Sequence, residues 1–384
     1  MTKNSLQKNK NNNICQNTSS VLFINLESIK ANYNLLKKKT NKSEVAVAVK
    51  ANAYGLGLQK ICKTLITQGC KTFFVATAEE GLEIVKIKKN LKVYVLNGSS
   101  DKKSTISLIK KGVKIVINNS HQLKVLISAS NKINIKAGCA VHVDTGMNRL
   151  GIDIEEAEKI IQIAKNNLNL SLIMSHLSCS ENKTSKMNNS QLIKFKNLKK
   201  KLIKFRGLKF SIANSNGILL GKKFHFDLCR PGGLIYGLNL SKIEKNNFSR
   251  VLSLRAKVLQ IKHINKGEYV GYGAKYKVKK KSVIATLGIG YADGLPRYFV
   301  GNVYYKIYKF PIIGNISMDL CTIDITSFNK LKIGSWVEIF GKSVSVERFA
   351  NICGTISYEI SSKIGKRVKR VYIDNFDEVN EFSK

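Results

Sequence analysis

The sequence predicts an α/β fold in two parts, a (β/α)8 barrel of the TIM type followed by a mostly antiparallel β domain. Apolar strand-like runs alternate with helix-like stretches eight times in the first part, which is the pattern of such a barrel. After about residue 240, strand patterns follow one another with short turns, which indicates an antiparallel sheet. A doubly wound open sheet is the alternative, but it more often has fewer units and a Gly-rich turn after its first strand.

The length of 384 residues is enough for two domains, each with its own core. We predict a flexible polar leader at residues 1–19, the barrel at 20–244 and the β domain at 245–384. No apolar run approaches the roughly 18 to 20 residues that a membrane span needs, and the N-terminus lacks the apolar core of a signal peptide. We therefore expect a cytoplasmic protein that does not bind membranes.

The chain is strongly basic, with 65 Lys and Arg against 25 Asp and Glu and a formal charge of +40. The lysines are dispersed and are not interleaved with aromatic residues, so we expect no specific nucleic-acid site, only nonspecific adhesion to polyanions at low salt. The eight cysteines form no CxxC pair and no zinc-knuckle spacing. They are interpreted as reduced, mostly buried thiols, and no metal site is expected.

The first expected elements are a strand at Val21–Leu26, which could also join the β domain, and a helix at Glu27–Lys39. The barrel strands are expected at Val45–Val49, Thr72–Ala76, Lys92–Leu96, Lys114–Ile117, Cys139–Val143, Leu170–Met174, Lys209–Ile212 and Phe226–Cys229. Helices between them include Leu58–Gln68, Ala78–Lys88, Glu155–Asn166 and Asn188–Phe205.

The β domain is expected to contain strands at Val251–His263, Glu268–Tyr272, Ser282–Ile289, Val303–Phe310, Thr322–Ile325 and Trp336–Phe340. Two short helices around Val346–Ile364 and a last strand at Val368–Ile373 complete it.

Lys50 stands at the end of the most apolar of these strands, in the stretch VAVAVKANAYGLG. On its own, this lysine could be a solvated charge that caps a strand. It could also be an amine in a dry pocket that lowers its pKa. The neutral amine could then bond to a carbonyl carbon or accept a proton. The residues that follow the other strands distinguish between these interpretations.

Polar residues and glycines follow the other strands, at the end of a barrel where active sites lie. They are Tyr54 after the first strand, Asp144–Arg149 after the fifth, His176 after the sixth, Asn214 and Ser215 after the seventh, and Arg230–Gly233 after the eighth. The loops after the last two strands are the usual phosphate site of such barrels. Ser215 and Gly232 could individually be a helix cap and a turn residue, but a phosphate cradle beside an interior lysine suggests pyridoxal phosphate.

Several motifs carry a family resemblance: AVKANAYGLG, HVDTGMNRLG, MSHLS, IANSNGIL, RPGGLIYGL, VGYGAKY, GYADGLPR, GNISMDL and GTISYEI. In this order, from about Val21 to Tyr372, the chain resembles alanine racemase, the fold-type III pyridoxal-phosphate enzyme. The resemblance implies a homodimer that racemises L- and D-alanine by a two-base mechanism and supplies D-alanine for peptidoglycan synthesis.

The resemblance also implies roles for individual residues. Lys50 would hold the cofactor covalently and serve as one catalytic base, and Tyr272, from the β domain of the partner subunit, would be the other. His176 would contact this tyrosine and Arg230, which faces the pyridine nitrogen and keeps it unprotonated because an arginine does not give up its proton. Arg149 would lie beside the phenolic oxygen of the cofactor and the substrate carboxylate.

The remaining implied residues surround the cofactor and the substrate. The backbone of Met318 would donate to the substrate carboxylate, and Tyr291 and Asp319 would line the entrance. The other cofactor-binding residues, most of them at the phosphate, would be Tyr54, Asn214, Ser215, Gly232, Gly233 and Tyr358.

Three positions depart from the family pattern. His142 stands where many members have a lysine that is sometimes carbamylated to orient the arginine, so Arg149 must be held differently, by a bound anion or less firmly. Leu56 replaces a histidine, and Asn315 with Ser317 replaces an arginine and a cysteine. The alternatives that remain are a racemase of the same architecture for serine, lysine or a broader set, a related decarboxylase, a noncatalytic pyridoxal-phosphate carrier, or a basic protein that adheres to nucleic acid.

Overall fold

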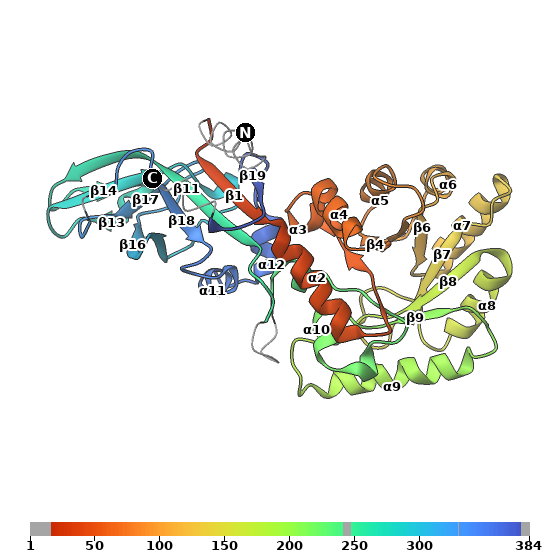
Figure 1. Ribbon diagram of the computed structural model, residues 1–384. Coiled ribbons are helices and arrows are strands. Elements are labelled where there is room, and N and C mark those ends of the chain that lie inside the picture. Colours follow the sequence, from red (N-terminus) through yellow and green to blue (C-terminus); the bar gives the residue numbers. More distant parts are fainter. Residues whose placement is uncertain (1–16, 241–246, 329, 378–384) are drawn as a thin grey trace, which may run out of the picture. The chain divides into compact units, whose positions relative to one another are not determined.

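The computed structural model describes residues 17–240, 247–328 and 330–377 (Figure 1). The chain divides into two compact units. Of the described residues, 29–235, 239–240 and 247–248 belong to the barrel unit, and 17–28, 236–238, 249–328 and 330–377 belong to the β unit. Of the predicted leader, residues 1–16 lie outside the described residues. No helix in the described ranges is both long and apolar enough to cross a membrane.

The barrel unit is a ring of parallel strands. In chain order they are β2 (Glu44–Val45), β3 (Val47–Ala48), β4 (Thr72–Val75), β5 (Lys92–Val95), β6 (Lys114–Ile117), β7 (Gly138–His142), β8 (Asn169–Met174), β9 (Lys209–Ser211) and β10 (Leu228–Cys229). Strands β3 to β9 pair in sequence order, and β10 pairs with β2. The amide of Ala46 donates to the carbonyl of Cys229 at 2.9 Å, and that of Arg230 donates to the carbonyl of Ala213 at 2.9 Å. These bonds close the ring, so the predicted (β/α)8 barrel is confirmed.

Helices lie outside this ring of strands (Figure 1). They are α2 (Leu26–Thr40), α3 (Lys50–Tyr54), α4 (Leu58–Thr67), α5 (Ala78–Val85), α6 (Lys102–Lys110), α7 (Ser120–Lys132), α8 (Ala157–Asn167), α9 (Lys186–Lys201) and α10 (Ser215–Leu219). Side-chain caps begin four of them: Thr77 starts α5 with a full capping box, Asp101 caps α6, Asn119 caps α7 and Asn214 caps α10.

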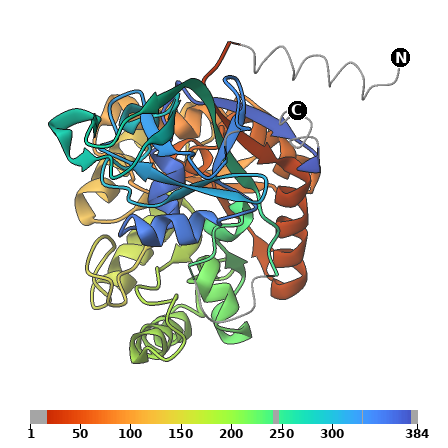
Figure 2. The same ribbon diagram turned by 90° about the vertical axis from the view of Figure 1, so that its left-hand side faces the viewer.

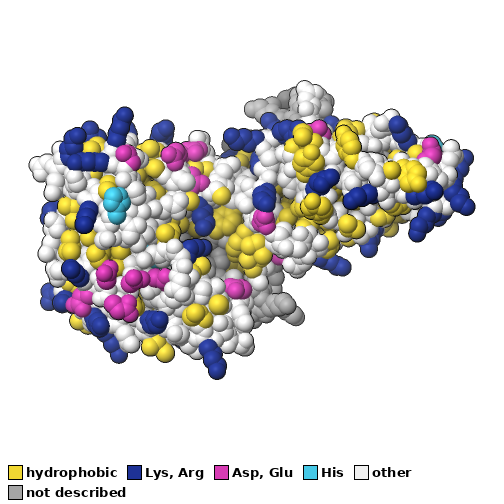
Figure 3. Space-filling model, turned by 180° about the vertical axis from the view of Figure 1, so that it is seen from behind, with side chains coloured by type: hydrophobic (Ala, Val, Ile, Leu, Met, Phe, Trp, Pro, Cys, Tyr) yellow, Lys and Arg dark blue, Asp and Glu magenta, His cyan; other side chains and the backbone are white. Residues whose placement is uncertain are grey.

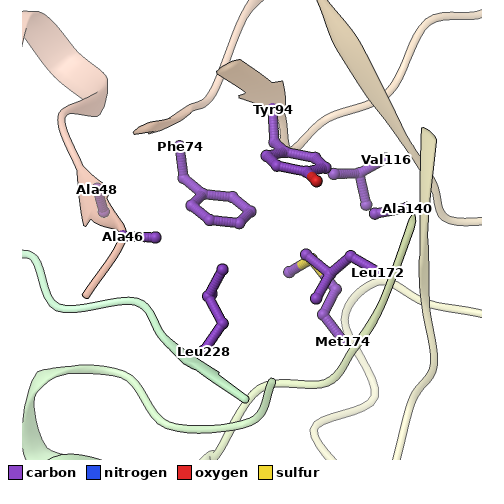
Figure 4. Close-up of a cluster of buried hydrophobic side chains, with 9 residues drawn as sticks. All are labelled: Ala46, Ala48, Phe74, Tyr94, Val116, Ala140, Leu172, Met174 and Leu228. Carbon is purple, nitrogen blue, oxygen red and sulfur yellow. The ribbon is translucent and has the colours of Figure 1, made fainter. Parts of the chain in front are cut away.

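The inside of the ring is filled by side chains from successive strands. Figure 4 shows this cluster: Ala46, Ala48, Phe74, Tyr94, Val116, Ala140, Leu172, Met174 and Leu228. The rings of Phe74 and Tyr94 stack with centroids 4.9 Å apart. Because small alanines face these large aromatic rings, the interior packs without leaving a pore. This packed core fixes the strand ends that carry the polar residues.

The β unit is built on a closed sheet (Figure 2). The strands of this sheet are β1 (Ser20–Asn25), β11 (Leu252–Ile264), β14 (Ser282–Leu287), β15 (Asn302–Tyr305), β16 (Tyr308–Ile313), β17 (Cys321–Asp324), β18 (Trp336–Phe340) and β19 (Lys369–Ile373). Two further strands, β12 (Tyr269–Val270) and β13 (Tyr276–Lys277), pair with each other in a separate antiparallel sheet. The long strand β11 pairs with both β14 and β18, so the order β14-β17-β16-β15-β18-β11 returns to its start. The early strand β1 pairs with β11 and β19 and thus joins the β unit. Two short helices, α11 (Val346–Ile352) and α12 (Ser357–Ser362), precede β19.

Two expectations for the β unit are corrected. The single strand expected at Val303–Phe310 is a hairpin of β15 and β16, because Lys306 adopts a left-handed φ of 54° and Tyr305 pairs with Tyr308. The strand expected to reach Tyr272 ends at Val270, and Tyr272 instead begins a 3-10 turn, η3 (Tyr272–Ala274). No Gly, Pro or Asn marks the turn at Lys306, which is why the sequence gives no signal for it.

The basic side chains are spread over the face seen in Figure 3 and do not gather over one element. This distribution agrees with the dispersed placement of the lysines along the sequence.

Candidate functional site

Lys50 follows β3 at the C-terminal end of the barrel strands. The amide of Val49, just before it, donates to the carbonyl of Phe74 at 2.9 Å, so the backbone is fixed up to the lysine. The side chain is half-buried. Burial and the nearby guanidinium of Arg149 lower the pKa of Lys50, and Glu80 opposes this only in part. These surroundings favour the interpretation as an amine in a dry pocket.

A left-handed turn follows Lys50, over Ala51 to Tyr54, where four successive φ angles lie between 53° and 56°. Each such residue costs about 1–2 kcal/mol relative to a right-handed conformation. The turn is held by hydrogen bonds: the amide of Gly57 donates to the carbonyl of Asn52 at 3.0 Å, and the amide of Leu58 donates to Asn52 Oδ1 at 2.7 Å. Its effect is to reverse the chain so that Tyr54 meets the loop after β10.

That loop and α10 form a cradle around the Ser215 hydroxyl. Ser215 Oγ accepts hydrogen bonds from the amides of Gly232 at 2.9 Å and Leu234 at 3.3 Å. A Cβ at Gly232 would overlap the hydroxyl of Tyr54 and lie 2.9 Å from its Cζ, so only glycine fits there. Burial raises the pKa of Tyr54 to about 12, which keeps its phenol protonated as a hydrogen-bond donor.

Asn214 holds this cradle rather than facing into it. Its Oδ1 accepts from the amide of Gly217 at 2.8 Å and from the hydroxyl of Ser180 at 2.9 Å, which makes it the cap of α10. Gly233, the next glycine of the cradle, begins the 3-10 turn η2 (Gly233–Tyr236).

Arg230 is a buried cation, 5% exposed, at the end of β10. It donates to the hydroxyl of Ser211 and the carbonyl of Ser175, and its Cζ lies 5.8 Å from the centroid of the Phe74 ring. Burial lowers its pKa to about 10. Within the ranges that the structure describes, no carboxylate forms an ion pair with it.

His176 lies among cations at the end of β8. Burial lowers its pKa well below the usual range, and Arg230, His142, Arg149 and Lys50 add to this effect. The imidazole is therefore neutral at pH 7. The barrel unit thus brings together the predicted residues Lys50, Tyr54, Arg149, His176, Ser215, Arg230 and Gly232 around a region of positive charge that suits an anionic ligand.

His142 is neutral as well, and its tautomer is fixed. Its Nδ1 lies 2.9 Å from Asn118 Oδ1, while the Asn118 amide group donates to the carbonyl of Leu96 at 2.9 Å. Nδ1 must therefore carry the proton, which leaves Nε2 as a hydrogen-bond acceptor. Burial, followed by the charge of Arg230, lowers the pKa of His142 to about 4. A neutral acceptor thus replaces the lysine of the family pattern.

The loop that carries Arg149 is clasped by Asp144. The carboxylate accepts hydrogen bonds from the backbone amides of Gly146 at 2.7 Å, Met147 at 2.8 Å and Asn148 at 2.7 Å. The exposed Arg149 follows directly. The Asp144 carboxylate therefore fixes the backbone of the loop, and no anionic side chain at position 142 is needed for this.

Sequence reasoning missed Gln191, a fully buried residue of α9 with 0% exposure. Its Nε2 donates to the Thr145 hydroxyl at 3.2 Å and to the His176 carbonyl at 2.8 Å. Its Oε1 accepts from the Ser178 amide at 3.0 Å and hydroxyl at 3.1 Å. One amide thus joins the loop after β7, which carries Arg149, to the loop after β8, which carries His176. The stretch SQLIKF offers no signal for this, because a glutamine among lysines is typical of a solvated helix face.

The β unit gathers a second set of predicted residues. Tyr272 is 74% exposed, and its carbonyl accepts from Asn315 Nδ2 at 2.9 Å. The amide of Tyr291 donates to the Ser317 carbonyl at 3.0 Å, and the amide of Ala292 donates to the Met318 carbonyl at 3.0 Å. The GYADG and SMDL segments are therefore joined backbone to backbone, and both departures, Asn315 and Ser317, take part in this framework.

Arg367 ties the same segments through side chains, since it binds Asp293 at 3.1 Å and Asp319 at 2.8 Å. Tyr358 is half-buried in α12, where its carbonyl accepts from the Ser361 hydroxyl at 3.2 Å. Leu56, the remaining departure, is fully buried in the barrel unit.

Both parts of the chain match models of known protein families. Residues 24–240 match the alanine racemase N-terminal domain, and residues 251–372 match the alanine racemase C-terminal domain. The alanine racemase of Rickettsia akari is 40% identical over 360 residues, which are 92% of this chain and 99% of the relative.

Solved structures agree with the sequence relatives. The alanine racemase from Bartonella henselae with covalently bound pyridoxal phosphate superposes with a TM-score of 0.87 at 37% identity, covering 93% of this chain and 100% of that one. An alanine racemase of Clostridium difficile gives a TM-score of 0.88 at 27% identity, covering 93% and 96%. Matches over both units, to sequences and to folds, lead to one conclusion: the chain belongs to the alanine racemase family.

Proposed function

We propose that this chain interconverts L- and D-alanine with pyridoxal phosphate by a two-base mechanism, as a cytoplasmic homodimer that supplies D-alanine for peptidoglycan. The observation that carries the proposal is Lys50, a half-buried amine with a lowered pKa that stands in the same barrel mouth as the Ser215 cradle. Family membership and the cofactor named for the Bartonella henselae structure support it.

The residues present fit pyridoxal phosphate. The cofactor needs an amine, a phosphate cradle and a group at its ring nitrogen. Gly232, where a Cβ would overlap the Tyr54 hydroxyl, lets backbone amides approach an anion, and Arg230 has no carboxylate partner in the described ranges. We assign the phosphate to Tyr54, Ser215, Gly232, Gly233 and Tyr358, with Asn214 supporting the cradle as the cap of α10.

The bound cofactor would draw electrons away from the substrate α-carbon, which makes its proton more acidic. Inversion then needs a proton acceptor on one face and a proton donor on the other. The lowered pKa of Lys50 increases the fraction of neutral amine that can accept a proton at neutral pH. We assign the opposite face to Tyr272 of the partner subunit, because the exposed tyrosine stands on a turn held by Asn315.

Arg230 and His176 determine the charge around the cofactor ring and beside Tyr272. With a pKa of about 10, Arg230 remains protonated at neutral pH, and it would keep the ring nitrogen of a bound cofactor unprotonated. His176 is the neutral link between Arg230 and Tyr272 in this scheme. Arg149 and the backbone amide of Met318 would bind the substrate carboxylate, and Tyr291 and Asp319 would line the entrance.

The test is subunit complementation between two inactive variants, Lys50→Ala and Tyr272→Phe. In a mixed dimer, one site combines both substitutions and the other has both natural bases. Because half of the randomly formed dimers are mixed, we expect about a quarter of the natural racemisation rate after mixing, measured by chiral chromatography. No recovery on mixing, with both variants folded and dimeric, would contradict a base supplied by the partner.

A further inference from the structure

The barrel has a cavity at the mouth where its strands begin, opposite to the mouth that carries Lys50, and charged and hydroxyl side chains are among its lining residues. Its volume is about 120 Å³, several times what one water molecule needs. It is lined by Glu44, Thr72, Lys92, Tyr94, Lys114, Ser171, Leu172, Gly207, Lys209 and Leu228. Five of these, Glu44, Thr72, Lys92, Lys114 and Lys209, are the first residues of their strands, whereas Lys50, His176 and Arg230 follow the strand ends. The apolar interior shown in Figure 4 lies between the two mouths.

The charges of this cavity are unbalanced. Lys92, Lys114 and Lys209 line it together with a single carboxylate, Glu44, which gives +3 − 1 = +2. Glu44 is engaged by Lys209 at 2.7 Å and by the Thr72 hydroxyl, and these hydrogen bonds outweigh burial and lower its pKa. In the described part of the chain, neither Lys92 nor Lys114 forms an ion pair.

Lys114 is built into the cavity rather than lying free on the surface. The side chain is half-buried and lies against Gly138, where a Cβ would stand 3.0 Å from Lys114 Cγ and 3.1 Å from Nζ. Its Nζ is 5.8 Å from the centroid of the Tyr94 ring. Burial lowers the pKa of Lys114; Cys139 opposes this and Lys92 adds to it. An anion in the cavity would relieve this unfavourable burial of positive charge.

Hydroxyl groups add hydrogen bonding to the charge. Tyr94 Oη lies 3.1 Å from Ser171 Oγ, and both residues line the cavity. Burial raises the pKa of Tyr94 to about 12, so its phenol stays protonated. Tyr94 can donate to Ser171 Oγ, and the Ser171 hydroxyl then directs its proton to the Cys139 carbonyl at 3.4 Å, a long bond that it can exchange for one to a ligand.

We propose that this cavity is a binding site for a small inorganic oxyanion of the phosphate type. Lys92 and Lys114 supply the charge, the Tyr94 and Ser171 pair supplies a hydrogen bond, and the Glu44–Lys209 pair closes one side. The volume accommodates an ion of a few atoms and excludes a nucleotide. Because the ion would bridge the starts of β5 and β6 in the folded barrel only, it would stabilise the fold.

The test is thermal unfolding of the cofactor-loaded enzyme against inorganic phosphate, with chloride adjusted to hold the ionic strength constant. Loading occupies the phosphate cradle at the other mouth, and the absorbance of the bound cofactor reports that it stays loaded. We expect a saturable rise in Tm with phosphate. Lys114→Met keeps the length and removes the charge, so it should weaken the apparent affinity about tenfold or more.

Lys110→Met, at an exposed position of α6, is the matched control and should leave the phosphate response unchanged. Gly138→Ala changes no charge, but its Cβ crowds Lys114 Nζ. This variant should therefore also weaken the apparent affinity for phosphate. An equal rise in Tm with chloride alone, or an unchanged phosphate response in Lys114→Met, would overturn the proposal. If Lys114→Met does not fold, the Gly138→Ala result decides.

Discussion

Replacing Gln191 by leucine removes the buried amide that joins the loops carrying Arg149 and His176. The hydroxyls of Thr145 and Ser178 still have other hydrogen-bond partners. Thr145 bonds the Ser175 hydroxyl at 2.8 Å, and Ser178 is only half-buried, so it can bond water. The His176 carbonyl and the Ser178 amide lose their partners at 2.8 and 3.0 Å. Because Ser178 is half-buried, its amide can also bond water, so we count one unsatisfied group, the His176 carbonyl, and expect the free energy of unfolding to fall by about 1–3 kcal/mol.

The same substitution should change the kinetics. Because the loops after β7 and β8 lose their common anchor, we expect a higher KM for alanine through Arg149 and a lower kcat through His176. Gln191→Glu keeps the shape and the acceptor for Ser178 but cannot donate to Thr145 and His176. We therefore expect an intermediate effect on both parameters, measured by a chiral racemisation assay beside urea unfolding.

Asn32→Leu is the matched control, since Asn32 is also buried and donates to the Ile235 carbonyl at 3.3 Å. This variant should lose stability without a change in KM. If Gln191→Leu and Asn32→Leu lose similar stability and both keep the natural kcat and KM, the glutamine only supports the fold and the reasoning about the two loops is wrong.

Three further predictions follow from single contacts. Gly232→Ala places a Cβ against the Tyr54 hydroxyl, so cofactor affinity should fall about tenfold or more in equilibrium dialysis, and unchanged affinity would contradict the cradle. Ala51→Gly, at an exposed left-handed position, should raise the free energy of unfolding by about 0.5–1 kcal/mol in urea titration, where a loss would contradict the strain at this turn. The folded-state pKa of His142, about 4, lies below its unfolded value, so the unfolded chain binds more protons and stability falls as pH drops from about 6.5 to 4. His142→Gln should remove about 3 kcal/mol of the difference in the free energy of unfolding between these pH values. An unchanged difference, measured by urea unfolding at several pH values, would contradict this.

The fold was largely predictable because its signals are local. Each barrel strand is a short apolar run followed by a polar residue, and the eight repeats leave few architectures other than a closed ring. The position of Lys50 at a strand end follows from the same pattern. The hairpin at Lys306 was not predictable, because its left-handed turn is made by a residue without turn preference.

The site was predictable only where residues carry motifs. The left-handed turn after Lys50 arises from bonds between its own backbone and Asn52, which no periodicity reveals. The protonation of His142 depends on Asn118 and on the Leu96 carbonyl, which meet only in the folded ring. Gln191 is similar, since its partners come from two loops that are distant in sequence.

The two-base claim is tested most directly by proton NMR of the cofactor-loaded enzyme with L-alanine in deuterated water, together with chiral analysis of the product. We predict loss of the α-proton signal and formation of deuterated D-alanine, because a proton is removed on one face and a solvent deuteron is added on the other. Exchange with retained L configuration would contradict the account, since it would mean that one base acts alone. No exchange at all, with the cofactor bound, would contradict racemisation itself.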